Sequence, residues 1–169
     1  MNGNLRDDAF WDEPQQEPPA ARVGTRHKVD KVTERLETRG RSRALQALYA
    51  ADLRDFAKLR RIAAHVFDDL AIEMGEREFA SKIVSTVADN CAEIDAALAD
   101  VTANWRFERL GAVERSVLRL AAAELARNET PVRVVLQESV RLAERYGTAR
   151  SARFVNGVLD AYARRIGRL

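Results

Sequence analysis

The sequence predicts an all-α protein, a compact bundle of about six or seven helices. Apolar residues recur at intervals of three and four along the chain after residue 41, and strand-like alternation of useful length is missing. The breaks between these periodic segments are only a few residues long, which is typical of helices packed as neighbours. A length of 169 residues with 46% hydrophobic residues is enough for one domain with a real core.

The first forty residues differ from the rest in charge. Residues 1–19 carry one arginine against five acids, a net charge of −4, and we expect residues 1–25 to form a disordered, acidic, proline-containing tail. Residues 20–43 have a net charge of +5, and residues 26–40 are predicted to be a basic, partly helical arm. A solvated, charge-rich helix or linker is the alternative for this arm. We also hypothesise that the tail folds back on the arm and competes with a polyanion.

Three amphipathic helices are expected in the first half of the domain, which we place at residues 41–169. The first spans residues 42–54, and residues 26–39 form either a separate helix or its extension. The second and third span residues 58–70 and 76–101. Their predicted inward-facing residues are Ala44, Leu45, Leu48, Tyr49, Leu59, Ile62, Val66, Phe67, Phe79, Ile83, Val87, Cys91, Ile94, Leu98 and Val101. Cys91, as the lone cysteine on this stripe, is expected to fill the core.

Three further helices follow a short aromatic connector at residues 104–111. One spans residues 112–127, with Val113, Val117, Leu120, Ala121 and Leu125 inside. The next begins with Thr130 as N-cap and Pro131 at its first position, and Gly147 ends it as a C′ glycine.

The last helix, after Gly147, has two faces. Its apolar face contains Val155, Val158, Leu159, Tyr162 and Ile166, and its basic face contains Arg150, Arg153, Arg164 and Arg168. Phe154 lies on the seam, so the periodicity leaves core packing and a surface role both open. Gly157 falls on the basic face, where a glycine costs about 1 kcal/mol relative to alanine and indicates a close approach.

Catalytic and metal-binding patterns are not found. His27 and His65 have no cysteine or carboxylate grouping with metal-ligand spacing, and the adjacent acids Asp68 and Asp69 point to different sides of a helix. No apolar run approaches the roughly 20 residues of a membrane span, and no signal peptide is evident. We therefore expect a cytoplasmic binding protein without cofactor or metal, not an enzyme.

Two basic elements indicate what it binds. The arm offers Arg26, His27, Lys28, Lys31, Arg39, Arg41 and Arg43, and the last helix offers Arg150 and Arg153 beside Phe154. Arginines attract phosphates, and an aromatic ring at their edge offers a platform to an unstacked base, worth about 1–3 kcal/mol. This combination favours single-stranded RNA over duplex DNA, for which no good helix-turn-helix spacing exists.

Two long segments resemble the NusB family of transcription antitermination factors. They are NWRFERLGAVERSVLRLAAAEL (residues 104–125) and ETPVRVVLQESVRLAERYGTARSARFVNGVLDAYAR (residues 129–164), and RSRALQALYAADLR (residues 41–54) resembles the family's first helix. The resemblance implies an all-helical fold of two packed helical subdomains. It also implies binding of the single-stranded boxA element of ribosomal RNA transcripts together with NusE, a small-subunit ribosomal protein, within an RNA polymerase antitermination complex that supports ribosomal RNA synthesis and maturation.

The same resemblance implies site residues. The RNA-binding candidates, from the family match and the two basic elements together, are Arg26, Lys28, Arg39, Arg41, Arg43, Tyr49, Arg150, Arg153, Phe154 and Gly157. The candidates for contact with NusE are Val113, Glu114 and Val117. Where many members have an acid before the serine that precedes the Phe-Val-Asn-Gly run, this chain has Arg150, which predicts tighter RNA binding with weaker discrimination. Glu37 and Thr38 interrupt the arginine cluster that the family commonly carries before its first helix.

Two other classes of protein are alternatives. An RNA methyltransferase with a NusB-like domain would need a cofactor-binding sheet in addition to that domain. We expect length to exclude this class, because no residues after 169 could form the sheet. The second alternative is a helical homodimerisation or protein-interaction module without a direct RNA role. It is considered because some family relatives form homodimers that cover the RNA surface. A stable dimer that fails to retain boxA RNA even with NusE would favour this second alternative.

Overall fold

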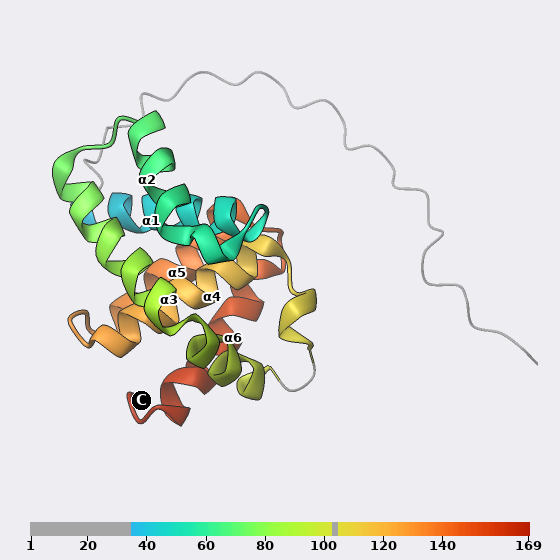
Figure 1. The fold of residues 1–169 in the computed structure, drawn as a ribbon. Coiled ribbons are helices and arrows are strands. Elements are labelled where there is room, and N and C mark those ends of the chain that lie inside the picture. The colour runs from blue at the N-terminus through green and yellow to red at the C-terminus, as the bar shows by residue number, and fades with distance from the viewer. Residues whose placement is uncertain (1–34, 103–104) are drawn as a thin grey trace, which may run out of the picture. The chain divides into compact units, whose positions relative to one another are not determined.

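The computed structural model describes residues 35–102 and 105–169, and these residues form helices without any strand. Within that part of the chain the elements are α1 (Leu36–Asp52), η1 (Phe56–Lys58), α2 (Leu59–Asp69), α3 (Met74–Val101), η2 (Phe107–Arg109), α4 (Ala112–Arg127), α5 (Val132–Tyr146) and α6 (Ser151–Arg165), with η marking 3₁₀ turns (Figure 1). The all-α prediction is confirmed. The predicted tail and most of the arm, with Arg26 and Lys28, lie outside the described residues.

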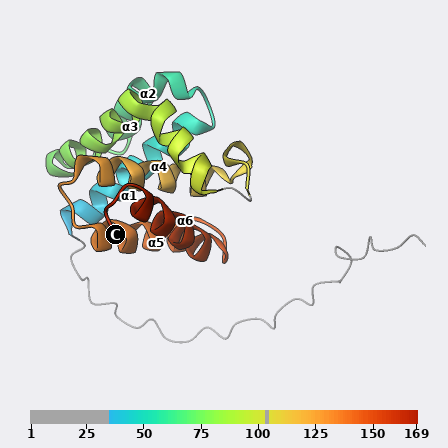
Figure 2. The same cartoon turned by 90° about the horizontal axis from the view of Figure 1, so that it is seen from below.

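The six α-helices form two groups that share one core. Helices α1, α2 and α3 pack against one another, α4 packs against α5 and α6, and α1 and α3 join the groups through α4. Seen from below, α2 and α3 lie on one side, α5 and α6 on the other, with α1 and α4 between them (Figure 2). This arrangement agrees with the expected two packed helical subdomains.

Helix α4 is the centre of the core. It contacts α1, α3, α5 and α6, and every residue from Ser116 to Leu125 is buried. The run Ala121–Ala123 lets neighbouring helices approach closely, because a methyl group is the smallest side chain that keeps helix propensity high. Two charged residues, Arg119 and Glu124, are buried in the same stretch and form ion pairs with other helices.

The Arg119 pairs fasten α4 to α1 and α3. Its Nη1 donates to Oδ1 of Asp52 at 2.9 Å, and its Nη2 donates to Oδ2 of Asp95 at 2.7 Å. Its guanidinium also lies over the Phe56 ring, 4.1 Å from the centroid. Arg115 donates to the second oxygen of Asp52 at 2.5 Å. Burial of these charges is tolerated because each is paired and hydrogen-bonded.

Several helix boundaries and inward faces differ from the prediction. Helix α1 begins at Leu36, so residues 36–39 extend it, and Tyr49 is 39% exposed where an inward position was expected. Asn90 has non-helical angles inside α3 and its side chain donates to the Thr86 carbonyl, which places a kink in the long helix. Pro131, not Thr130, is the N-cap of α5, because helical angles begin at Val132.

Cys91 fills the core only in part. The residue is half-buried, and its thiol lies 3.8 Å from a carboxylate oxygen of Asp95. Burial and the negative charge of Asp95 raise the pKa of the Cys91 thiol, so the thiolate that would react or bind metal is disfavoured.

Candidate nucleic-acid interface

A groove of about 890 Å³ lies where the α3–α4 connector meets the first turns of α4 and α6. We call it the α6 groove. It is lined by two aromatic residues, Trp105 and Phe154, which we call the aromatic pair, and by the groove arginines Arg109, Arg150 and Arg153. The groove therefore unites four of the predicted RNA-binding residues, which are Arg150, Arg153, Phe154 and Gly157.

The aromatic pair offers an accessible apolar surface. Trp105 is 65% exposed, and its ring meets the Phe154 ring edge-on, with centroids 6.2 Å apart and planes at 73°. Phe154 is half-buried and packs against the core with its other side. The two roles that periodicity leaves open for Phe154 are thus combined, since one ring anchors α6 and also forms part of the groove surface.

The groove arginines supply positive charge. All three side chains belong to exposed residues, and none of them forms an ion pair within residues 35–102 and 105–169. Arg150 and Arg153 lie at the start of α6, where the helix dipole adds a partial positive charge. The site can therefore attract an anion without first breaking a salt bridge to another described residue.

A hydrogen-bond network in the lining of the groove, which includes the acidic residue Glu114, holds the two helix starts together. The Ser151 hydroxyl donates to a carboxylate oxygen of Glu114 on α4, and it accepts from the backbone N–H of Thr148 at 2.7 Å. Gly147 ends α5 with φ −97°, so it does not adopt the left-handed conformation that its predicted C′ role implies. It is needed instead for a close approach, because a Cβ there would lie 2.5 Å from the Ser151 hydroxyl.

Gly157 opens the far side of the groove. It is exposed, and a Cβ added to it would have no neighbour within 4 Å among the described residues. The glycine therefore leaves room for a ligand and has no packing role there, in line with its predicted place on the basic face.

The basic residues of α1 form a second cluster, separate from the α6 groove. We call Arg39, Arg41 and Arg43 the α1 basic cluster. Arg39 and Arg43 both donate to the carboxylate of Glu76 on α3, at 2.6 and 3.2 Å. Although burial acts to raise the pKa of Glu76, these two arginines hold it below its ordinary value. An RNA phosphate would have to compete with Glu76 for both guanidinium groups.

Two predicted contact residues are buried and cannot touch a ligand in this structure. Arg41 is 3% exposed and is paired with Glu124, so its prediction as an RNA contact gives way to a structural role. Val117 is fully buried in the core, so it cannot meet a partner directly. Its predicted neighbours Val113 and Glu114 are half-buried at the start of α4.

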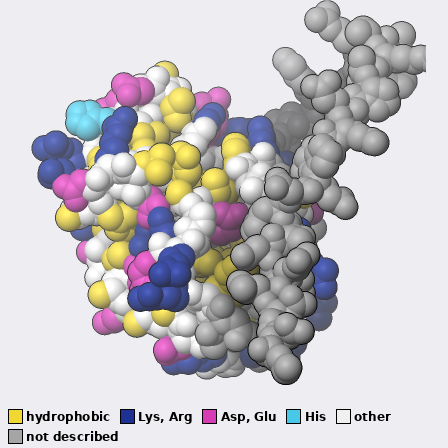
Figure 3. Space-filling model, turned by 90° about the vertical axis from the view of Figure 1, so that its right-hand side faces the viewer, with side chains coloured by type: hydrophobic (Ala, Val, Ile, Leu, Met, Phe, Trp, Pro, Cys, Tyr) yellow, Lys and Arg dark blue, Asp and Glu magenta, His cyan; other side chains and the backbone are white. Residues whose placement is uncertain are grey.

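The α1 basic cluster and the α6 groove do not converge. Arg41 meets α4 at Glu124, whereas the groove meets it at Glu114, and ten residues of helix span about 15 Å. On the face shown in Figure 3, basic and acidic side chains alternate instead of gathering in one continuous patch.

Two groove residues, Trp105 and Arg109, were not predicted from the sequence. Both lie in the connector before α4, in or next to η2, and the only signal in the sequence is the aromatic run Trp105-Arg106-Phe107. Phe107 is the buried anchor of that run, 4% exposed, and its packing leaves Trp105 facing solvent. A connector without periodicity gives no face from which to infer such a division.

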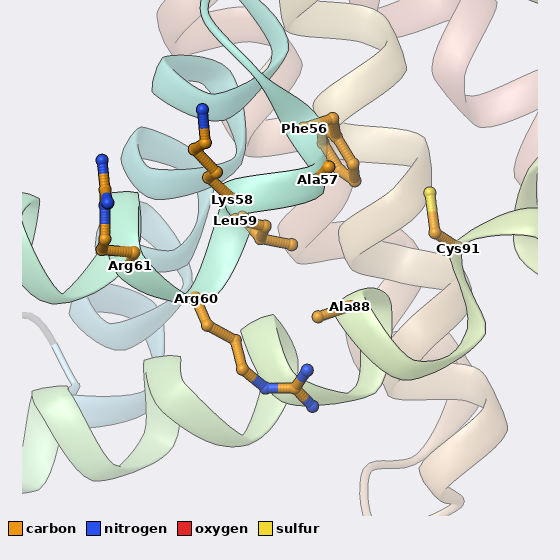
Figure 4. Close-up of a pocket in the computed structure, with 8 residues that line it drawn as sticks. All are labelled: Phe56, Ala57, Lys58, Leu59, Arg60, Arg61, Ala88 and Cys91. Carbon is orange, nitrogen blue, oxygen red and sulfur yellow. The ribbon is translucent and has the colours of Figure 1, made fainter.

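Other features of the described residues are less suited to a ligand. A cleft of about 530 Å³ beside η1 is lined by Phe56, Leu59, Ala88 and Cys91, with Lys58 and Arg61 extending away from it (Figure 4). No group of three or more metal-ligating side chains occurs in residues 35–102 and 105–169. Within the same ranges, the helices are too short or too polar for a bilayer crossing.

The fold and the groove define an all-helical protein with a basic, aromatic binding surface, and comparison with known proteins identifies its class. The model of the NusB family matches residues 38–164. The chain belongs to the NusB family.

Relatives and solved structures agree with this assignment. Transcription antitermination protein NusB of Anaeromyxobacter dehalogenans is 42% identical over 135 residues, which cover 75% of this chain and 89% of the relative. The protein of the same description from Sorangium cellulosum is 41% identical, covering 77% and 93%. Among solved structures, T. maritima NusB has a TM-score of 0.70 at 32% identity, covering 76% and 90% of the two chains. A structure described as antitermination factors NusB and NusE in complex with dsRNA has a TM-score of 0.71 at 30% identity, covering 78% and 98%.

Proposed function

We propose that this protein is a transcription antitermination factor that binds single-stranded boxA RNA of ribosomal RNA transcripts together with NusE. The observation that carries the proposal is the α6 groove, in which an accessible aromatic pair lies among three arginines that have no acidic partner in the described part of the chain. Membership in the NusB family and the curated relatives' description as antitermination proteins support it.

The groove suits an unpaired strand better than a duplex. Guanidinium groups bind phosphates, and the exposed face of Trp105 can stack on a base that is not held in a helix. Stacking tolerates any base, so the aromatic pair supplies affinity, while hydrogen bonds to base edges would supply the boxA preference. Gly157 leaves open space through which the sugar-phosphate chain can continue.

We place NusE at the start of α4, beside the groove, where Glu114 and Val113 are accessible in part. The related structure that holds NusB, NusE and RNA supports a joint assembly of this kind. Action in the cytoplasm within the RNA polymerase antitermination complex, as a binding protein and not as an enzyme, is part of the same proposal.

A gel shift tests the proposal. BoxA-like and scrambled single-stranded RNAs are compared with and without NusE over a salt series, and we expect selective retention of boxA RNA that strengthens with NusE and weakens with salt. Trp105→Ala should lower the affinity about tenfold, whereas Trp105→Phe keeps a ring and should retain most of it.

Two results would overturn the proposal. Equal binding of both RNAs would make the protein a non-specific polycation. A stable homodimer that retains no boxA RNA even with NusE would favour the protein-interaction alternative.

A further inference from the structure

Glu114 differs from the other partly buried acids in the described part of the chain. Every other acidic residue of residues 35–102 and 105–169 that is buried or half-buried forms an ion pair with an arginine or a lysine. These acids are Asp52, Asp55, Glu76, Asp95, Glu124, Glu138 and Asp160. Glu114 is half-buried, and its hydrogen-bond partner among the described residues is the neutral hydroxyl of Ser151. Its negative charge is therefore not paired with a described cation.

The carboxylate of Glu114 is held in the lining of the α6 groove. Ser151 donates to Oε1, and the same hydroxyl accepts from the backbone N–H of Thr148 at 2.7 Å. The other oxygen, Oε2, lies against Gly111, where an added Cβ would collide with it. Glu114, Ser151 and Gly111 all line the groove. One oxygen is thus positioned by Ser151, while Oε2 has no hydrogen-bond donor among the described residues.

A negative charge in this groove opposes the binding of phosphates but suits the edge of a base. The carboxylate repels the phosphates that the groove arginines attract. A carboxylate is, however, a good acceptor for the N4 amino group of cytosine. Uracil carries an acceptor, O4, at the same ring position, so Oε2 repels it. The charge therefore lowers general affinity for RNA and favours one pyrimidine over the other.

We propose that Oε2 of Glu114 selects amino-bearing bases in the α6 groove, so that cytosine is bound in preference to uracil. The base stacks on the aromatic pair, its N4 amino group donates to Oε2, and the groove arginines bind the neighbouring phosphates. The inference rests on the proposed function, because it needs RNA in this groove. It deepens that function by naming the residue that reads the base edge.

Stabilisation of α4 is the structural alternative for Glu114. The residue lies in the first turn of α4, where a carboxylate interacts favourably with the helix dipole. A glutamate at this position often accepts from the N–H of the N-cap residue. Within the described residues, Glu114 instead accepts from Ser151 of α6. A role in helix stability alone would give no preference between bases, so base preference distinguishes the two roles.

Two single-stranded RNAs of equal length, oligocytidine and oligouridine, test the inference at neutral pH. The full-length chain carries Trp11→Phe, which leaves Trp105 as the only tryptophan, and quenching of Trp105 fluorescence by a stacked base reports binding in the groove. NusE is left out, so a contact between Glu114 and NusE does not contribute. We expect oligocytidine to bind at least about fivefold more tightly than oligouridine.

Glu114→Gln should remove this preference or reverse it. The amide oxygen can remain on Ser151, which places the NH2 group where Oε2 was, and that group donates to O4 of uracil. Affinity for oligouridine should therefore rise, while the ratio of the two affinities falls to about one or below. Glu108→Gln is the matched control, because it removes the same charge from an exposed residue of η2 outside the groove lining. It should strengthen both RNAs alike and keep the preference.

Gly111→Ala moves the carboxylate without changing the charge of the protein. The new Cβ displaces Oε2 of Glu114, and the fold is kept because the end of a glutamate side chain can shift. The preference for oligocytidine should decrease in this variant as well. Its melting temperature, measured beside that of Glu114→Gln, checks that both chains are folded.

Several results would overturn the inference. Equal affinity of the unaltered chain for the two RNAs would do so while leaving RNA binding in place. A preference that persists in Glu114→Gln or in Gly111→Ala would do so as well, and a gain for both RNAs alike in Glu114→Gln would reduce the effect to general charge. A chain whose Trp105 is quenched by neither RNA would overturn the proposed function together with the inference.

Discussion

The guanidinium group of Arg41 forms two hydrogen bonds with the carboxylate of Glu124, with Nε–Oε2 and Nη2–Oε1 distances of 2.7 Å. Both side chains are under 5% exposed, and the guanidinium also lies 5.1 Å from the centroid of the Phe79 ring. The pair joins residues 83 apart in the sequence and fixes the start of α1 to the end of α4. A basic residue that the sequence offers as an RNA contact is therefore part of the core.

Arg41→Ala is expected to destabilise the fold by about 3–5 kcal/mol, because it leaves the Glu124 carboxylate buried without its cation. Urea unfolding followed by circular dichroism measures the change. Arg164→Ala is the control, since Arg164 is exposed and pairs with Asp160 one turn away in α6, and its midpoint should match that of the unaltered protein. If the Arg41→Ala protein has normal stability but does not bind RNA, Arg41 contacts RNA and its structural role is wrong.

Asp52 makes stability depend on pH in the acid range. Burial acts to raise its pKa, but hydrogen bonds and charges from Arg115 and Arg119 lower it further, so the folded-state pKa lies below the ordinary 3.8. A carboxyl whose pKa is depressed by folding stabilises the fold above its unfolded-state pKa, and this contribution is lost as pH falls through the folded-state pKa. We expect the unaltered protein to lose stability progressively below about pH 4.

Asp52→Asn should be less stable at pH 7 and should show a flatter dependence of the unfolding free energy on pH between about 5 and 2.5. Urea unfolding at a series of pH values measures both effects. Asp69→Asn, at an exposed position on α2, is the matched control and should parallel the unaltered protein. If the curve for Asp52→Asn is parallel to that of the unaltered protein, the interactions of Asp52 with Arg115 and Arg119 do not set this pH dependence.

Periodicity predicted the helices well because an amphipathic stripe is a local property of the sequence. Helix α4 was placed at residues 112–127, as observed, since its apolar spacing runs unbroken between Gly111 and Asn128. The start of α1 was left open between a separate helix and an extension, because residues 36–41 have few apolar side chains and their helical form depends on tertiary contacts. Gly40, for example, is buried against Phe79 of α3, a contact that no pattern within α1 contains.

The candidate site was harder to predict than the fold. Arg41 and Arg43 are two positions apart on one helix, yet one is sealed by Glu124 and the other keeps 30% of its side chain exposed. Whether each arginine is buried or exposed depends on the neighbouring helix and not on the sequence of α1. Arg150 and Phe154 were predicted to lie close together because both belong to the first turns of the last helix, and both line the α6 groove. Trp105 comes from a connector whose position depends on the whole fold.

Arg150→Asp should weaken binding of boxA RNA and reduce the slope of log affinity against log salt by about one for each phosphate that is no longer bound. Arg150 is exposed at the N-cap of α6 and has no described ion pair, so its replacement breaks no salt bridge to a described residue. Arg133→Asp on α5 changes the net charge equally at an exposed position outside the groove, and it should change affinity much less. An unchanged salt slope for Arg150→Asp would contradict a phosphate contact.

Gly157→Leu should weaken binding of RNA or of NusE while leaving the melting temperature unchanged or slightly raised. Apart from the neighbouring backbone of α6 itself, no described atom lies within 4 Å of a Cβ at this position, so a side chain fits without strain. Leucine also has a helix propensity about 0.8 kcal/mol better than that of glycine. The added side chain would fill the open side of the α6 groove. Thermal unfolding and the gel shift, carried out on the same preparation, separate the two effects.

Gly40→Ala is the opposite control for Gly157→Leu. An added Cβ at Gly40 would lie 2.7 Å from Cδ1 of Phe79, so this smaller substitution should lower the melting temperature by crowding α1 against α3. Its effect on RNA binding should follow the decrease in folded protein. If Gly157→Leu instead unfolds the protein as Gly40→Ala does, Gly157 packs against another helix in solution and the open side of the groove does not exist.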